Sequence, residues 1–142
     1  MRGRGLLVAF GVWTLFVWAT RIGTAWSQDD LSTAGRAGRV GLALSFTAFG
    51  VVLLVVAGRA RGRALTGTET LLVRVAAGWT IAVWVVRGAG IALADHEAAF
   101  VVVHTVLALV SIALAVVTVR TTTMPLRHGT TGHRRREAHV TS

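Results

Sequence analysis

The sequence predicts an all-α membrane protein, with four transmembrane helices in a left-handed bundle built from two parallel-repeat helical hairpins. Three observations carry this prediction. Of the 142 residues, 54% are hydrophobic and only 15% are charged, whereas soluble globular domains carry about 25% charged residues. The apolar residues fall into four long blocks, and a segment containing Trp and Arg in the first block recurs in the third.

Each block is long enough to cross a bilayer, because a hydrocarbon core of about 30 Å needs roughly 20 apolar helical residues. Lipid offers the backbone no hydrogen bonds, so such segments are expected to be helical. The expected spans are about Leu6–Trp26, Ala37–Ala57, Leu71–Ala94 and Ala98–Val119. Residues 1–120 then form one transmembrane domain, with repeats at about 6–58 and 71–120. Residues 121–142 form a basic cytoplasmic tail that we expect to be disordered.

Short motifs at the ends of the spans allow further predictions about where the helices begin and whether the first span is cleaved. The basic start, the apolar stretch and Ala25-Trp26-Ser27 also fit a secretory signal with a small-residue cleavage site. We favour a membrane span, because the segment has a counterpart deeper in the chain. The sequence Thr66-Gly67-Thr68-Glu69 predicts a capping box at the start of the third span. Asp95 is a suitable N-cap for the fourth.

The charged residues that give the formal net charge of +9 are unevenly distributed among the segments that flank and connect the spans. Arginines precede the first span, lie between the second and third, and follow the fourth: Arg2, Arg4, Arg59, Arg61, Arg63, Arg120, Arg127, Arg134, Arg135 and Arg136. The other two connections hold Asp29, Asp30, Asp95 and Glu97 beside only Arg36 and Arg39. The positive-inside bias therefore predicts cytoplasmic N- and C-termini. We expect anionic inner-leaflet lipid near Arg59–Arg63 and Arg134–Arg136, and no nucleic-acid partner.

The basic residues also indicate the source of the protein. Arg supplies all fifteen, and the chain has no Lys, Asn or Tyr. This avoidance of AT-rich codons predicts a high-GC bacterium, and hence a multi-pass protein of the bacterial cell membrane.

An internal repeat links the first and third spans. Trp13–Arg21 and Trp79–Arg87 both read W-T-x-x-V-W-x-x-R, and each copy is followed eight residues later by an aspartate, Asp29 or Asp95. The two spans run in the same direction, so the repeats would be related by a pseudo-two-fold axis along the membrane normal.

Each span carries a seam of mostly small and polar residues at spacings of three and four, which predicts the inward face. The expected seams are Gly11, Thr14, Trp18, Arg21 and Ala25 in the first span; Ala34, Gly38, Gly41, Ser45 and Ala48 in the second; Ala77, Thr80, Trp84, Arg87, Ile91 and Ala94 in the third; and Val101, His104, Ala108, Ser111 and Ala115 in the fourth.

The ionisable residues on these seams predict a ligand pocket. At about 1.5 Å per residue, Arg21, Arg87, His104 and Ser45 fall in one layer near the outer face. Trp18 and Trp84 are candidate walls, and Asp95 lies above. Guanidinium groups suit planar oxyanions such as carboxylate or phosphate. In a second interpretation the arginines snorkel to the interface as anchors, and a neutral His104 bonds Ser45 or a carbonyl.

One stretch resembles a known group of proteins. The residues Arg87, Asp95-His96, Phe100 and Val103-His104-Thr105-Val106-Leu107-Ala108 resemble small four-span membrane proteins of unassigned function predicted in actinobacteria. The resemblance implies a four-span fold over most of the chain and no particular activity.

These features favour a non-enzymatic role, because the sequence offers no nucleophile–base pair, carboxylate dyad or phosphate loop. The tail histidines His128, His133 and His139 are not expected to bind metal, and we expect no cofactor. The leading interpretation is a structural or accessory module of a membrane assembly, as a homo-oligomer or a subunit, with an outward-facing basic pocket. The alternatives are binding or transport of a small anionic solute, and a cofactor or quinone site. A continuous polar path below Thr14, Thr80 and Ser111 would favour transport.

Overall fold

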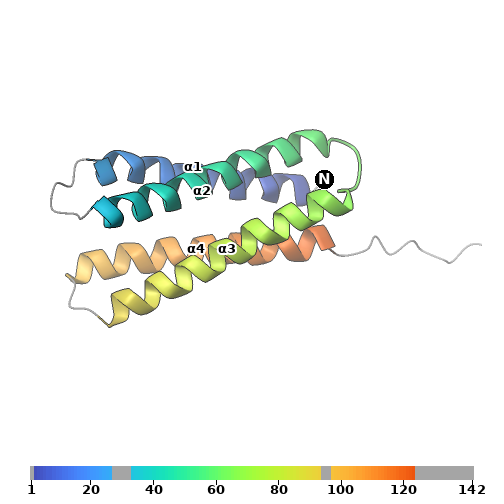
Figure 1. Cartoon of the computed structure of the whole chain (residues 1–142). Helices are drawn as coiled ribbons and strands as arrows, with labels where there is room; N and C mark the ends of the chain where they lie inside the picture. Colours follow the sequence, from blue (N-terminus) through green and yellow to red (C-terminus); the bar gives the residue numbers. More distant parts are fainter. Residues whose placement is uncertain (1, 27–32, 94–96, 124–142) are drawn as a thin grey trace, which may run out of the picture.

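The chain folds into helices that are long and apolar enough to cross a membrane, in a computed structural model that describes residues 2–26, 33–93 and 97–123 (Figure 1). These residues form four helices: α1 (Arg2–Trp26), α2 (Thr33–Arg59), α3 (Gly67–Ala92) and α4 (Ala98–Thr123). The all-α fold with four candidate membrane spans is therefore confirmed. The tail beyond Thr123 lies outside the described residues.

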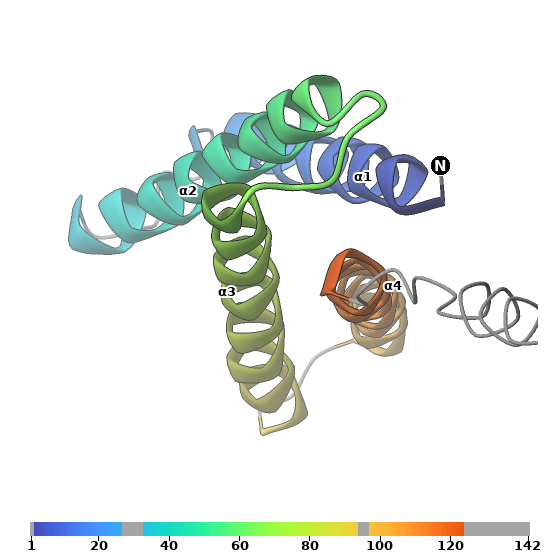
Figure 2. The same cartoon turned by 90° about the vertical axis from the view of Figure 1, so that its right-hand side faces the viewer.

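The helices pack as two hairpins, α1 with α2 and α3 with α4 (Figure 1). Within the described residues α1 packs most extensively on α2 and also contacts α4, whereas α1 and α3 make no close backbone contact. Helices α2 and α3 contact each other least among the neighbouring pairs, and they diverge away from their connection (Figure 2). We call the end of the bundle that holds this connection and the N-terminus the terminal end, and the opposite end the distal end.

Two clusters of buried side chains form the core. The cluster in the terminal half is almost entirely aliphatic and joins all four helices: Leu7, Phe10, Leu53, Val56, Ala57, Val73, Ala76, Ala77 and Ala115. The distal cluster is aromatic and consists of Val17, Trp18, Ala43, Phe46 and Trp84. In it the rings of Trp18 and Phe46 are stacked with centroids 4.1 Å apart.

Helices α1 and α3 bury residues at the same spacing. Five buried positions match in spacing, Leu7, Phe10, Gly11, Thr14 and Trp18 in α1 with Val73, Ala76, Ala77, Thr80 and Trp84 in α3. Val17 of α1 and Glu69 of α3 are also buried, and the residues at their equivalent positions are only partly buried. The inward faces predicted for these two spans are confirmed at every member whose buried or exposed state is described, with Arg21, Arg87 and Ile91 partly buried. In α4 the predicted Ser111 and Ala115 are buried.

The inward face predicted for α2 is wrong. Ala34, Gly38, Gly41 and Ala48 are exposed and Ser45 is only partly buried, whereas the buried face consists of Ala43, Phe46, Gly50, Leu53, Val56 and Ala57. This face mixes large and small residues, so small residues alone are a poor guide to the packed side of α2. A span that is apolar all round has no polar face to oppose its packed one.

Gly11 of α1 and Gly50 of α2 lie against each other. A Cβ added at Gly50 would lie 3.2 Å from the Gly11 carbonyl oxygen, and one added at Gly11 would lie 3.1 Å from the Gly50 oxygen. Only glycine allows two helix backbones to approach this closely. This pair therefore sets the separation of the first hairpin.

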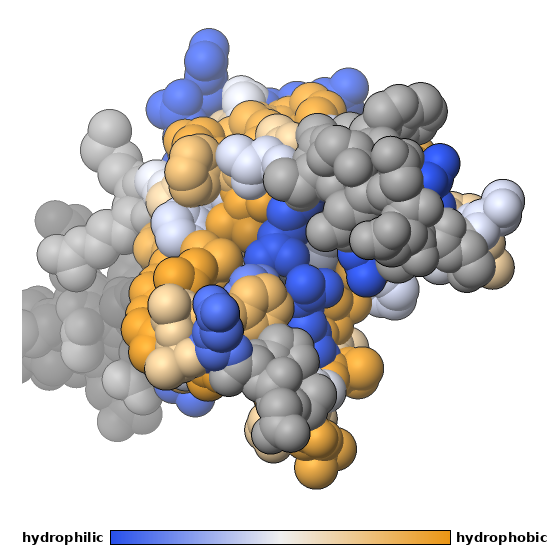
Figure 3. All heavy atoms as spheres, turned by 90° about the vertical axis from the view of Figure 1, so that its left-hand side faces the viewer, coloured by the Kyte–Doolittle hydropathy of each residue, from blue (hydrophilic) through white to orange (hydrophobic). Residues whose placement is uncertain are grey.

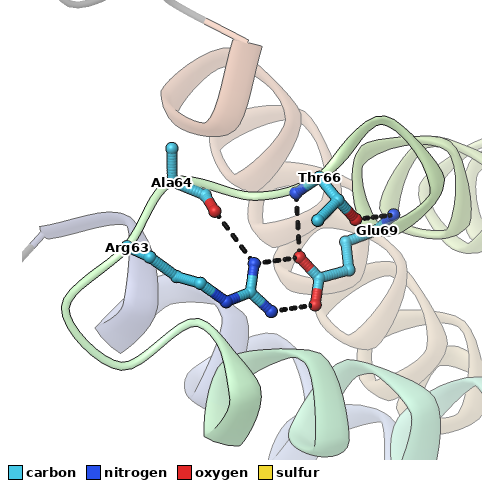
Figure 4. A network of polar contacts seen from close by, with 4 residues as sticks. All are labelled: Arg63, Ala64, Thr66 and Glu69. Atoms are coloured by element: carbon cyan, nitrogen blue, oxygen red, sulfur yellow. Dashed lines mark hydrogen bonds and ion pairs between the residues drawn. The ribbon is translucent and has the colours of Figure 1, made fainter.

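The connection between α2 and α3 is held by a polar network (Figure 4). Gly62 has a φ of 77°, which a glycine adopts without strain. The predicted capping box is confirmed, because Thr66 Oγ1 accepts from the Glu69 N–H and Glu69 Oε2 accepts from the Thr66 N–H at 2.9 Å. Arg63 Nη1 also donates to Glu69 Oε2 at 2.7 Å. The hydrogen bond to Glu69 raises the pKa of Arg63 further above its ordinary value, so this pair holds the turn in one geometry.

Candidate functional site

A cavity of about 650 Å³ lies in the distal half of the bundle. Side chains from all four helices line it: Phe16, Val17, Trp18, Thr20, Arg21, Arg39, Leu42, Ala43, Arg87, Phe100, His104 and Leu107. Hydrophilic side chains occupy the middle of the distal end, with apolar side chains around them (Figure 3). The lining thus combines three arginines and a histidine with a mostly apolar wall.

Arg21 and His104 join α1 to α4 across this cavity. Arg21 Nη2 lies 3.0 Å from His104 Nε2, and His104 Nδ1 lies 2.9 Å from the carbonyl oxygen of Phe100. A guanidinium only donates, so Nε2 accepts and carries no proton. Nδ1 then carries the proton and donates to Phe100. This geometry assigns His104 as a neutral imidazole that fixes the direction of Arg21.

Arg87 faces the same cavity from α3, on the helix diagonally opposite α1. It interacts electrostatically with Arg21 and with Arg39 of α2. Its Nε is buried and has no hydrogen-bond partner. Three like charges from three helices therefore converge on one space, and at least one buried donor there is unused.

Aromatic rings form the inner boundary of the cavity. The guanidinium carbon of Arg21 lies 5.6 Å from the centroid of the Trp18 ring, within the range of a cation–π interaction. Behind Trp18 lie Phe46 and Trp84 of the distal cluster. On the α4 side the ring of Phe100 lies 3.9 Å from that of His104. Both members of the Arg21–His104 pair are thus braced by an aromatic neighbour.

The structure brings together four of the seven predicted site residues, Arg21, Arg87, His104 and Trp18. Trp84 is 2% exposed and lies in the distal cluster rather than in the cavity lining. Ser45 is not in the lining either, because its hydroxyl donates to the Leu42 carbonyl of its own helix at 2.7 Å. His104 therefore takes a carbonyl and an arginine as partners rather than Ser45. Asp95 lies outside the described residues.

Sequence reasoning missed Arg39. The charge pattern assigns Arg39 to the connection, although the expected span Ala37–Ala57 already contains it; α2 begins at Thr33 and carries Arg39 into the lining. The signal was present in the spacing, since Arg39 lies three and four residues before Leu42 and Ala43. These positions share one face of a helix.

Directly below the cavity the polar groups are hydrogen-bonded within the bundle, whereas the buried Thr118 hydroxyl, nearer the terminal end, has no hydrogen-bond partner. Thr14 and Thr80 are buried and donate to the Phe10 and Ala76 carbonyls of their own helices, each at 2.8 Å. Trp13 Nε1 donates to Ser111 Oγ at 3.0 Å. The aliphatic cluster follows beneath this layer. The residues that the structure describes therefore form no continuous polar path from the cavity to the terminal end.

The site was also examined for metal ligands, and the chain was compared with known proteins. Among the described residues no group of three or more His, Cys, Asp or Glu side chains lies close enough to hold a metal ion. No family model, no curated protein and no solved structure matches this chain.

Proposed function

We propose that this membrane protein binds a small anion in its distal cavity, with Arg21, Arg39 and Arg87 as the binding residues. The observation that supports the proposal is the convergence of three guanidinium groups from three helices on one cavity. Ionisable side chains are costly inside a membrane and are functional candidates by default.

The chemistry of the lining fits an oxyanion. Guanidinium groups offer paired N–H donors that match carboxylate and phosphate oxygens. Like charges held close together disfavour each other, and an opposite charge between them relieves this repulsion. His104 adds no positive charge in its neutral form and orients Arg21 toward the cavity. An anion bridging Arg21 and Arg87 would also give the unused Nε of Arg87 an acceptor.

Binding is favoured over transport by the packing beneath the cavity. Phe10, Leu53 and Val73 are at most 1% exposed and fill the terminal half of the bundle. An ion crossing this region would lose its hydration and gain few polar partners, which costs several kcal/mol or more. By the arginine distribution the distal end faces outward, so the site would sample the medium outside the cell.

The proposal is tested by anion-dependent stability in a neutral detergent. Phosphate or acetate at constant ionic strength should raise the unfolding temperature, because a ligand that binds only the folded state stabilises it by mass action. Arg87→Gln should abolish this effect. Arg74→Gln is the matched control, because Arg74 is exposed on the same helix and lies outside the cavity. Equal anion dependence in both variants, or none in the parent protein, would overturn the proposal.

The exposed face of α4 supports a second role, as an accessory module in a membrane assembly. Val102, Val106, Leu109 and Val117 are all more than 40% exposed and recur at helical spacing along one side. This face would contact lipid in a monomer and a partner helix in an assembly. Sedimentation in detergent separates the two. A monomer that is unaffected by Leu109→Trp would remove the support for an assembly through this face.

A further inference from the structure

We propose that the ligand of the distal cavity is an amphiphilic anion taken from the membrane. Its phosphate or carboxylate head would lie on Arg21, Arg39 and Arg87, and its apolar chain would lie between α1 and α4. This inference rests on the proposed anion binding and goes further, because it names the kind of molecule and its route of entry.

The lining divides into a charged part and an apolar part. Beyond the arginines, His104 and Thr20, the remaining residues are all hydrophobic: Phe16, Val17, Leu42, Ala43, Phe100 and Leu107, with Trp18 beside Arg21. Water held against such a wall would gain few hydrogen bonds, so an inorganic ion would leave this part of the cavity poorly filled. A hydrocarbon chain fills it by contact alone.

The apolar part opens to the side of the bundle. Phe16 of α1 and Phe100 of α4 line the cavity and yet are 63% and 38% exposed, so they lie at its mouth. Phe16 is five residues before Arg21, which places it about 7.5 Å deeper along α1. Phe100 lies four residues before His104, about 6 Å nearer the distal end. The mouth therefore extends from the level of the arginines down to the lipid chains beside Phe16.

The charged part lies at the level of lipid headgroups. Arg21 ends the apolar segment Gly3–Arg21 of α1, and arginines at span ends reach the interface. A lipid-like molecule could therefore place its head on the arginines while its chain stays in the hydrocarbon layer. The volume of about 650 Å³ also falls within the range of about 300–1,000 Å³ that is typical of pockets for organic ligands.

The inference is tested with the protein in phosphatidylcholine nanodiscs, by comparing inorganic phosphate, butyl phosphate, dodecyl phosphate and dodecanol as probes. Dodecyl phosphate should stabilise the protein at total concentrations at least 100-fold below those of inorganic phosphate. Across the phosphates the apparent Kd should fall by up to about fourfold per added methylene. Dodecanol should have no effect, and Arg87→Gln should abolish the response to both long-chain and inorganic phosphate.

A second variant separates binding from partition into the disc. Leu107→Trp fills the apolar part of the cavity. It should weaken the stabilisation by dodecyl phosphate, whereas the stabilisation by inorganic phosphate should be unchanged. Val103→Trp is the control, because Val103 is 55% exposed on the same helix and does not line the cavity. If both variants respond alike, or if dodecyl phosphate acts no better than inorganic phosphate, the amphiphile proposal fails and anion binding stands. If neither phosphate stabilises the protein, or if dodecanol does so equally well, both proposals fail.

Discussion

Gly50 of α2 packs against the backbone of Gly11 of α1. A Cβ at Gly50 would lie 2.8 Å from Leu15 Cγ and 3.2 Å from the Gly11 carbonyl oxygen, too close for ordinary packing. The absence of side chains at these two positions lets α1 and α2 pack closely below the cavity. Arg21 lies ten residues beyond Gly11 on the same helix.

Gly50→Ala should consequently destabilise the first hairpin. Overpacking of this kind costs about 1–3 kcal/mol, because Leu15 and the facing backbone must move. Gly41→Ala is the matched control, since Gly41 is on the same helix and a Cβ there meets nothing within 4 Å. Equilibrium unfolding in detergent measures both changes. Equal stability of the two variants would show that the close approach does not limit packing.

The capping box gives a second expectation at the other end of the bundle. Thr66→Ala removes the side-chain acceptor for the Glu69 N–H and should cost about 0.5–2 kcal/mol, as loss of an N-cap typically does. Thr68→Ala, at an exposed position two residues later, should have little effect. The free energy of unfolding of both variants checks this. A Thr66→Ala protein as stable as the parent would mean that packing alone fixes the start of α3.

Much of the fold follows from the sequence, because the bilayer imposes length and apolarity on each span. The capping box and the inward faces of α1 and α3 were also predictable, since polar and aromatic residues such as Thr14, Trp18 and Arg87 mark them. The α2 face was not, because its apolar residues leave no contrast between sides. Arg39 is not predicted as a site residue because the charge pattern counts it with the connection, whereas α2 begins at Thr33 and includes it.

The repeat is a prediction that the structure leaves open. Thr14 and Thr80, like Trp18 and Trp84, have matching burial. Trp13 and Trp79 differ, because Trp13 donates to Ser111 while Trp79 is 42% exposed. Duplication preserves environments only where the neighbouring helices are also equivalent, and the first hairpin packs more extensively than the second.

The membrane orientation is a third expectation, which follows from the arginine distribution. A reporter that is active only in the cytoplasm should work when fused after Arg63 or Ser142. It should fail when fused after Asp30 or His96. Activity at either of the last two positions would invert the topology and place the cavity on the cytoplasmic side.

His104 gives a fourth expectation, which concerns the direction of Arg21. His104→Leu removes the acceptor of Arg21 Nη2 and should lower the unfolding free energy by up to about 1–3 kcal/mol. His104→Gln should retain part of that stability, because its amide oxygen can accept from Arg21. Thermal unfolding of the two variants, together with their phosphate response, measures the difference. If Leu and Gln are equivalent at this position, the Arg21–His104 hydrogen bond does not support the site.

The central claim is that Arg21 and Arg87 face one shared anion, and a double-mutant cycle tests it most directly. Thermal unfolding is measured for the parent, Arg21→Gln, Arg87→Gln and the double variant in neutral detergent, with and without phosphate. We expect each single change to relieve repulsion, cost little stability without phosphate and abolish stabilisation by phosphate. The two changes should then be non-additive, as for residues that share a partner. Additive effects, with no stabilisation of the parent by phosphate, would contradict the account and leave the arginines as separate interfacial anchors.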